Sequence, residues 1–119
     1  MSRNPLSMTE PQKCLGEAIV ILRENQPEAA RNLAQRAVEL GLDDTTVWGV
    51  IALANRDLVD YENAQLAADR AIARDPRNAR AYIVKADVFY AQENMKAAAA
   101  FYRQALIINP LHPAMVQEI

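Results

Sequence analysis

The sequence resembles itself at a spacing of 34 residues, and this repetition constrains the fold more than any other feature. Alanine carries much of the signal, since the chain has 22 alanines but only three glycines. Such a balance supplies small residues for closely packed helices and little material for tight turns. The alanines that share a repeat position are Ala18, Ala52 and Ala86; Ala30, Ala64 and Ala98; and Ala37, Ala71 and Ala105. The chain is therefore expected to be a stack of similar helical units.

Each unit reads as two antiparallel helices, because apolar residues recur every three or four positions in two stretches separated by a short polar break. Residues that favour the start or the end of a helix lie at these breaks. Those suited to a start are Thr9 with Gln12, Pro27, Asp44, Asp60, Asn78 and Asn94, and those suited to an end are Gly41, Pro76 and Pro110. We expect an all-α fold.

The third unit has aromatic and small residues in a set order along its two helices. These residues, with the proline that ends the unit, are Tyr82, Ala86, Phe89, Ala98, Tyr102, Ala105 and Pro110. Their order resembles the tetratricopeptide repeat. The second unit keeps Trp48 and the alanines but has Asn55 and Ala68 where aromatic residues are usual, and the first unit diverges most. The resemblance implies a right-handed superhelical α-α solenoid of three helix pairs.

The repeat register also divides the chain into segments. Residues 1–10 form an N-terminal tail, and the three units span 11–44, 45–78 and 79–112. Residues 113–119 begin a fourth unit in register, because Val116 falls where Trp48 and Tyr82 fall. A repeat stack needs a polar outer face at its end, so this segment is either a truncated fourth repeat or the start of a short capping helix.

Composition limits the cellular compartment that we expect for the protein and the classes of partner that we expect it to bind. A net charge of −2 and a pI near 5.4 argue against a nucleic-acid partner, which would favour a basic face. No apolar run is long enough to span a bilayer, and the first ten residues do not resemble a signal peptide. Cys14, the one cysteine, cannot form an internal disulfide. We expect a cytoplasmic protein without a membrane partner.

The sequence has few residues of the kinds that act in catalysis or bind metals and cofactors. His112, the one histidine, precedes a proline and is expected to be a turn or cap residue rather than a base or a metal ligand. The Asp43–Asp44 pair is explained by helix capping, and no glycine-rich phosphate loop is present. The sequence therefore predicts no enzyme activity, no metal site and no cofactor.

The resemblance implies where a partner would bind, since the first helix of each unit lines the concave face in this family. The residues mapped to that groove are Leu15, Ile19, Leu22, Leu53, Arg56, Arg80, Ile83, Asp87 and Tyr90. A strip through Leu15, Ile19, Leu53, Ile83 and Tyr90 is expected to leave apolar surface facing solvent, which usually marks a contact site.

One specialisation of the family is improbable here. Relatives that hold the acidic C-termini of heat-shock chaperones use a clamp of lysine, asparagine and arginine side chains, which form charge-assisted bonds. The matching positions in this chain are Leu15, Ile19, Val50, Arg80 and Val84. Only Arg80 keeps a suitable charge, so a co-chaperone role of that type is not expected.

Two functions from different classes stay open. The first is a non-catalytic protein–protein interaction scaffold that binds a peptide or partner segment in its groove. The second is the N-terminal accessory domain of a larger bacterial enzyme, because residues 85–106 resemble the repeats before aspartyl/asparaginyl β-hydroxylase-like and sulfotransferase-like domains. The partner is then a downstream domain of the same polypeptide, and uncapped ends also allow a homo-oligomer.

Overall fold

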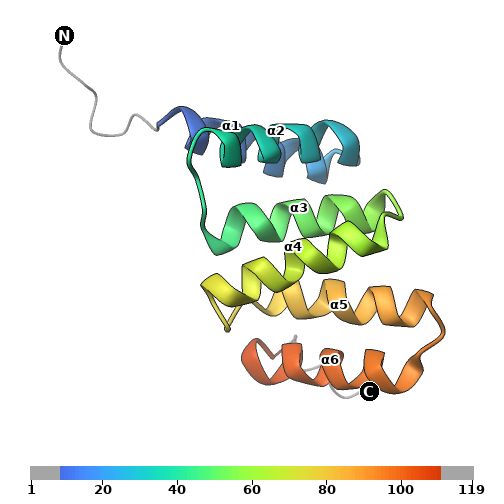
Figure 1. The fold of residues 1–119 in the computed structure, drawn as a ribbon. Coiled ribbons are helices and arrows are strands. Elements are labelled where there is room, and N and C mark those ends of the chain that lie inside the picture. The colour runs from blue at the N-terminus through green and yellow to red at the C-terminus, as the bar shows by residue number, and fades with distance from the viewer. Residues whose placement is uncertain (1–8, 111–119) are drawn as a thin grey trace, which may run out of the picture.

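The structure, a computed structural model, describes residues 9–110 as six α-helices stacked in consecutive pairs (Figure 1). The helices are α1 (Glu10–Arg23), α2 (Pro27–Glu39), α3 (Thr45–Asp57), α4 (Tyr61–Arg74), α5 (Ala79–Ala91) and α6 (Met95–Ile108). The described residues contain no strand, so the expected all-α solenoid of three helix pairs is confirmed. His112 and the segment 113–119 lie outside the described residues, as do residues 1–8 of the expected tail.

Asp44, Asn78 and Asn94 start helices through their side chains, as expected, whereas α2 begins at Pro27 without a side-chain cap hydrogen bond. Asp44 Oδ1 accepts a hydrogen bond from the backbone N–H of Val47 at 2.9 Å. Asn78 and Asn94 make the same contact with the residue three positions later, each at 3.2 Å. These bonds satisfy backbone donors that have no partner within the helix, and they explain where α3, α5 and α6 begin.

The turn inside each pair has one repeated geometry that the sequence did not indicate. Asn25, Val59 and Glu93 occupy the same repeat position, just after α1, α3 and α5, and have φ of 65°, 62° and 62°. In each case the next residue donates its backbone N–H to a carbonyl five positions back, as Asp60 does to Asn55 at 2.8 Å. This is the Schellman ending of a helix, which requires a left-handed residue.

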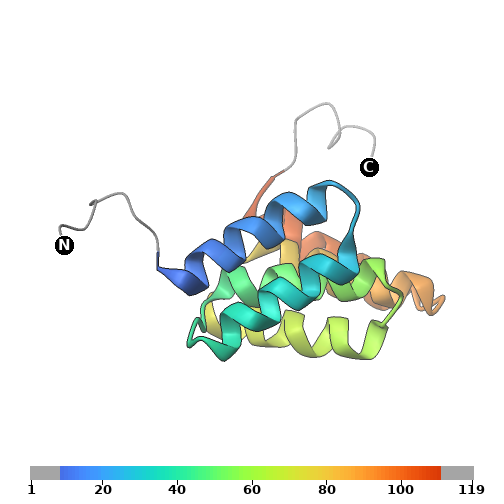
Figure 2. The same ribbon diagram turned by 90° about the horizontal axis from the view of Figure 1, so that it is seen from above.

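Buried alanines bring the two helices of each pair together. All three alanine columns lie in the interior, with exposed fractions between 0% and 4%. Small side chains at a crossing allow two helix axes to approach at the short end of the usual range. Seen from above the stack, α1 and α2 run side by side in opposite directions (Figure 2).

The pairs stack asymmetrically. The first helices contact one another, α1 with α3 and α3 with α5, and each second helix packs on the first helix of the next pair. Within the described helices, α2 does not pack against α4, nor α4 against α6. One face of the solenoid is thus formed by α1, α3 and α5, and the other has a space between successive second helices.

Candidate functional site: a groove across the first helices

A groove of about 440 Å³ crosses the face formed by α1, α3 and the start of α5. Its apolar lining comes from Ile19 and Leu22 on α1 and from Val50 and Leu53 on α3. Its polar lining is Arg23, Thr45, Thr46, Asp75, Asn78 and Arg80, and Gly49 completes the surface. Clefts with an apolar lining and a few placed polar groups are the usual form of binding sites in proteins.

A hydrogen-bonded pair fixes one end of this groove. Asn78 Nδ2 donates to Thr45 Oγ1 at 2.8 Å, and Thr45 Oγ1 donates to the carbonyl oxygen of Ala71 at 2.8 Å. Because Asn78 also caps α5, the start of the third unit is tied to the start of the second. A Cβ atom at Gly49 would lie 3.3 Å from Asn78 Nδ2. A glycine at this position therefore leaves room for the hydrogen bond between Asn78 and Thr45.

The groove carries more positive than negative charge. Arg23 and Arg80 are exposed, and neither forms an ion pair with another residue of the described range 9–110. Asp75 is the one acidic residue of the lining, and its Oδ1 accepts the backbone N–H of Arg77 at 3.0 Å. The groove therefore favours an apolar ligand with an acidic group over a basic ligand.

Two predicted groove residues instead bond to each other. Arg56 Nη1 on α3 lies 2.8 Å from Asp87 Oδ2 on α5, and the hydroxyl of Tyr102 on α6 donates to Asp87 Oδ1. Partial burial, together with the hydrogen bond to the Asp87 carboxylate, raises the pKa of Tyr102 to about 12. This cluster joins three helices, so Arg56 and Asp87 hold the first-helix face together.

The predicted apolar strip is wrong at Leu15. Its side chain is only 9% exposed and belongs to the main hydrophobic core with Val47 and Val50, so it offers no surface to a partner. The physical reason is that α1 contacts α3, and Leu15 shares one core cluster with residues of α3. Ile19, Leu22, Leu53 and Arg80 are brought together in the groove.

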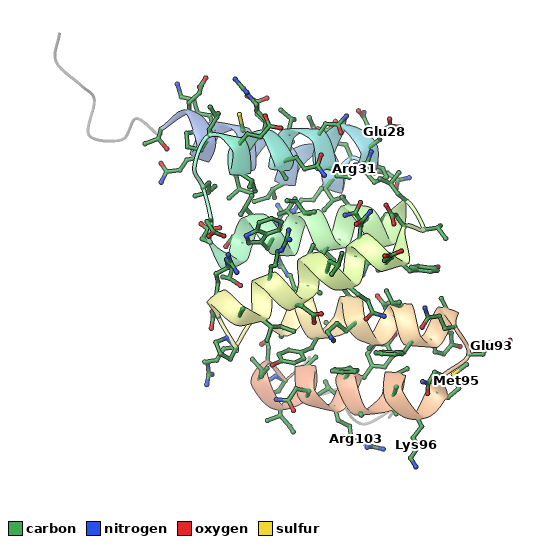
Figure 3. All side chains as sticks on the ribbon, viewed as in Figure 1. Glu28, Arg31, Glu93, Met95, Lys96 and Arg103 are labelled. Atoms are coloured by element: carbon green, nitrogen blue, oxygen red, sulfur yellow. The ribbon has the colours of Figure 1, made fainter. Side chains whose placement is uncertain are left out.

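Ile83 and Tyr90, which the sequence also maps to the groove, do not line it. Tyr90 is 58% exposed near the end of α5 and does not line the groove. Ile83 lines a second, larger hollow of about 730 Å³ between α5 and α6, with Tyr102 and Leu106. Arg103 also lines this hollow, and Figure 3 shows Arg103 on the outer side of α6, at the end of the stack.

Sequence reasoning missed the Thr45–Asn78 pair and the contact of Tyr102 with Asp87. A signal existed for the first, because Thr45 begins and Asn78 ends the same repeat, and neither type of residue suits a core. Tyr102 matched a structural position of the repeat, and only the placed side chain shows its hydroxyl reaching the opposite helix. Across residues 9–110 no cluster of potential metal ligands occurs, and none of the helices there is long and apolar enough to cross a membrane.

Comparison with known proteins gives one family and several solved folds. The sequence model of a family described as "Tetratricopeptide repeat" matches residues 51–113. No curated protein matches the chain in sequence. The TPR domain of OM64 from Arabidopsis has a TM-score of 0.80 and 24% identity, with 91% of this chain and 90% of that chain covered.

Two further solved structures are similar in fold at lower identity. The second TPR of Spaghetti (RPAP3), bound to the HSP90 peptide SRMEEVD, has a TM-score of 0.76 and 15% identity, with 85% of this chain and 94% of that chain covered. The type III secretion translocator chaperone SycD of Yersinia enterocolitica has a TM-score of 0.79 and 14% identity, with 97% and 87% covered. At these identities the likeness shows the fold.

Proposed function

The chain belongs to the tetratricopeptide repeat family, and from this premise we propose that it is a protein-interaction module whose groove binds an extended segment of a partner. The observation that carries the proposal is the groove that gathers Ile19, Leu22, Leu53 and Arg80. These residues come from three helices of three units, and an extended ligand would contact all of them at once.

The lining favours one kind of ligand. Apolar side chains of the ligand would cover Ile19, Leu22 and Leu53, and an acidic group would meet Arg23 or Arg80. The HSP90 peptide is a ligand of the Spaghetti (RPAP3) domain, and this chain has a different groove lining. Val50 and Val84, at two positions of the chaperone clamp described above, are buried aliphatic residues that offer no hydrogen bond. We therefore propose an apolar, acidic internal segment as the ligand.

A selection experiment tests the groove. A library of displayed random peptides is panned against the chain, and binders are then measured against two groove variants, Leu53→Asp and Arg80→Glu. Leu53 packs partly against the core, so its variant is used only if thermal unfolding stays cooperative. Arg80 is exposed, so its charge reversal is expected to leave the fold intact. The matched control is Ile107→Asp, an exposed apolar residue on α6.

The proposal predicts selected peptides that combine apolar and acidic residues. Their affinity should fall by at least about tenfold in the Arg80→Glu variant, as expected when an attraction becomes a repulsion. The Ile107→Asp control should bind them as the original chain does. Peptides that bind both variants and the control equally would place the binding site outside the groove.

The hollow between α5 and α6 favours a second candidate, an accessory domain against which another part of the same polypeptide packs. The hollow is larger than the groove, and Ile83, Tyr102 and Leu106 give it a mostly apolar wall. An antibody raised against this chain would measure the mass of the native polypeptide. A band near 13.2 kDa favours the free module, and a much heavier band favours the accessory domain.

We also propose the cytoplasm as the compartment in which this binding takes place. The single cysteine cannot form an internal disulfide, which is consistent with a reducing environment. Fractionation of the source cells, followed by immunoblotting with the same antibody, tests this placement.

A further inference from the structure

The two ends of the stack expose faces that are covered inside it. The hollow of about 730 Å³ between α5 and α6 occupies the place where α3 packs on the first pair and α5 packs on the second. At the other end, a hollow of about 340 Å³ lies on α1, and no helix pair precedes α1 in the described range 9–110. Figure 1 shows the α1–α2 pair and α6 at opposite ends of the stack.

The hollow on α1 is built from repeat positions that are buried in the second unit. Its lining is Lys13, Gly16, Glu17, Val20 and Ile21. The equivalent residues on α3 are all buried, and they are Val47, Val50, Ile51, Ala54 and Asn55. Val20 shows the contrast most clearly, because it is 53% exposed whereas Ala54 and Val88, at the same repeat position, are fully buried. An apolar residue exposed where the repeat buries it indicates a contact surface.

A pair of facing charges links the second unit to the third. Lys85 Nζ on α5 lies 2.5 Å from Asp69 Oδ1 on α4. Two repeat lengths before Lys85 the chain has Glu17, on α1, and one repeat length after Asp69 it has Arg103, on α6. Both are exposed, and Figure 3 shows Arg103 on the outer side of α6. The two ends of the stack thus carry the same pair of positions with the charges exchanged, so they remain complementary.

A second pair of positions on the first-helix face behaves in the same way. Arg56 on α3 and Asp87 on α5 lie 2.8 Å apart and join the second unit to the third. One repeat length after Arg56 the chain has Tyr90, which is 58% exposed on α5, and two repeat lengths before Asp87 it has Ile19 on α1. An ion pair inside the stack is therefore matched by an aromatic and an aliphatic residue at its ends.

From these correspondences we propose that the hollow between α5 and α6 receives α1 of a second copy of this chain, so that copies stack head to tail in the register of the repeat. Glu17 of the second copy then pairs with Arg103, and its Ile19 packs on Tyr90. Lys13 has a flexible aliphatic stem that lies along the interface and keeps its amine in water. Because the contact joins two different faces, each added copy presents both faces again, and the assembly extends beyond a dimer.

Stacking of this kind is independent of the groove of the proposed function, which is formed within each copy by α1, α3 and the start of α5. It gives the hollow between α5 and α6 an occupant other than a further part of the same polypeptide. A failure of the groove experiment therefore leaves the stacking proposal standing, and the reverse also holds.

Sedimentation velocity of the full chain at concentrations up to about 1 mM, in low salt, tests the stacking. We expect the average sedimentation coefficient to rise with concentration, with species larger than a dimer. Glu17→Arg and Arg103→Glu should each weaken association by at least about fivefold, because each replaces an attraction by a repulsion. The matched controls are Glu62→Arg and Arg77→Glu, which make the same charge changes at exposed residues in the middle of the stack and should leave association unchanged.

A charge exchange identifies the residues that face each other. The double variant Glu17→Arg/Arg103→Glu should associate as the original chain does. An equimolar mixture of the two single variants should also associate, because the α1 face of each variant then meets an α6 face of opposite charge. Thermal unfolding of each variant, measured beside the original chain, shows that the exposed substitutions leave the fold intact.

The proposal is overturned if the chain remains a monomer at every concentration, which would assign the hollow to another part of the same polypeptide. It is equally overturned by a dimer that grows no further, because a symmetric contact pairs one face with itself. Association that Glu17→Arg and Arg103→Glu do not weaken, or that the charge exchange does not restore, would place the interface elsewhere and would also overturn the proposal.

Discussion

Arg56 on α3 and Asp87 on α5 are 31 residues apart in sequence, yet Arg56 Nη1 lies 2.8 Å from Asp87 Oδ2. The two side chains are 27% and 30% exposed, so water screens the pair only in part. The ion pair links the first helices of the second and third units on the face that carries the groove. It therefore fixes the spacing of the helices between which a ligand would lie.

This pair should contribute measurably to folding. A double-mutant cycle of Arg56→Ala and Asp87→Ala, followed by urea unfolding, is expected to give a coupling energy of about 1 kcal/mol. The same cycle on Arg36 and Glu39, an exposed pair within α2, should give a coupling near zero. Equal coupling energies in the two cycles would contradict this assignment.

The left-handed turn after α3 carries a residue that does not suit it. Val59 has φ of 62° and is 65% exposed, whereas the equivalent positions hold Asn25 and Glu93. A β-branched residue is strained in this conformation, while asparagine tolerates it. Val59→Asn should raise the free energy of unfolding by about 0.5–1 kcal/mol, measured by urea denaturation. Glu93→Asn should raise the free energy of unfolding less. If Val59→Asn leaves this free energy unchanged, the turn at Val59 is not strained.

Acid should weaken the link between Asp43 and Arg74. The guanidinium of Arg74 donates to both carboxylate oxygens, at 2.6 and 2.9 Å, and the indole of Trp48 donates to one. These bonds lower the pKa of Asp43 from 3.8 to about 2. Because the folded-state pKa is depressed, the stabilisation is complete above the unfolded value and is lost as the pH falls from about 4 to about 2.

Thermal unfolding of an Asp43→Asn variant across this pH window measures the effect. The variant should unfold at a lower temperature than the original chain near pH 6, and the difference should shrink toward pH 2. Asp69→Asn serves as a comparison, because Asp69 is exposed and its one hydrogen bond comes from Lys85. A difference for Asp43→Asn that stays constant with pH would exclude the ionised carboxylate as its source.

The alanine columns should tolerate no larger residue. Ala52 and Ala86 are fully buried where helices cross, so Ala52→Leu and Ala86→Leu should each cost about 1–3 kcal/mol of unfolding free energy. Ala100 is exposed on α6, and Ala100→Leu should change stability by less than about 0.5 kcal/mol. Equal losses at all three positions in thermal unfolding would contradict the helix register.

The fold could be predicted because the features that determine it are local or periodic. The 34-residue spacing marks the alanines at the helix crossings, and each cap depends on a few neighbouring residues, as with Asp44 and Val47. The pattern of the family then supplies the way in which successive units stack. The left-handed turns at Asn25, Val59 and Glu93 were not indicated, because that position tolerates residues of very different types.

The site was predicted less completely, because it depends on which side chains meet across units. The repeat position of a residue predicts the helix face on which it lies, but not the side chains that it contacts. The pattern therefore places Leu15 in the groove, although residues of α3 cover it. Arg56 and Asp87 were both mapped to the same face, and only their placement shows that they bond to each other.

The central claim is that the groove across α1, α3 and α5 holds the partner segment. The most direct measurement is a ¹H–¹⁵N NMR titration of the chain with a selected peptide. The account predicts that the largest shifts fall on residues of the groove wall, with Ile19, Gly49, Leu53 and Asn78 among them. Shifts concentrated on the outer faces of α2, α4 and α6, with the groove residues unmoved, would contradict it.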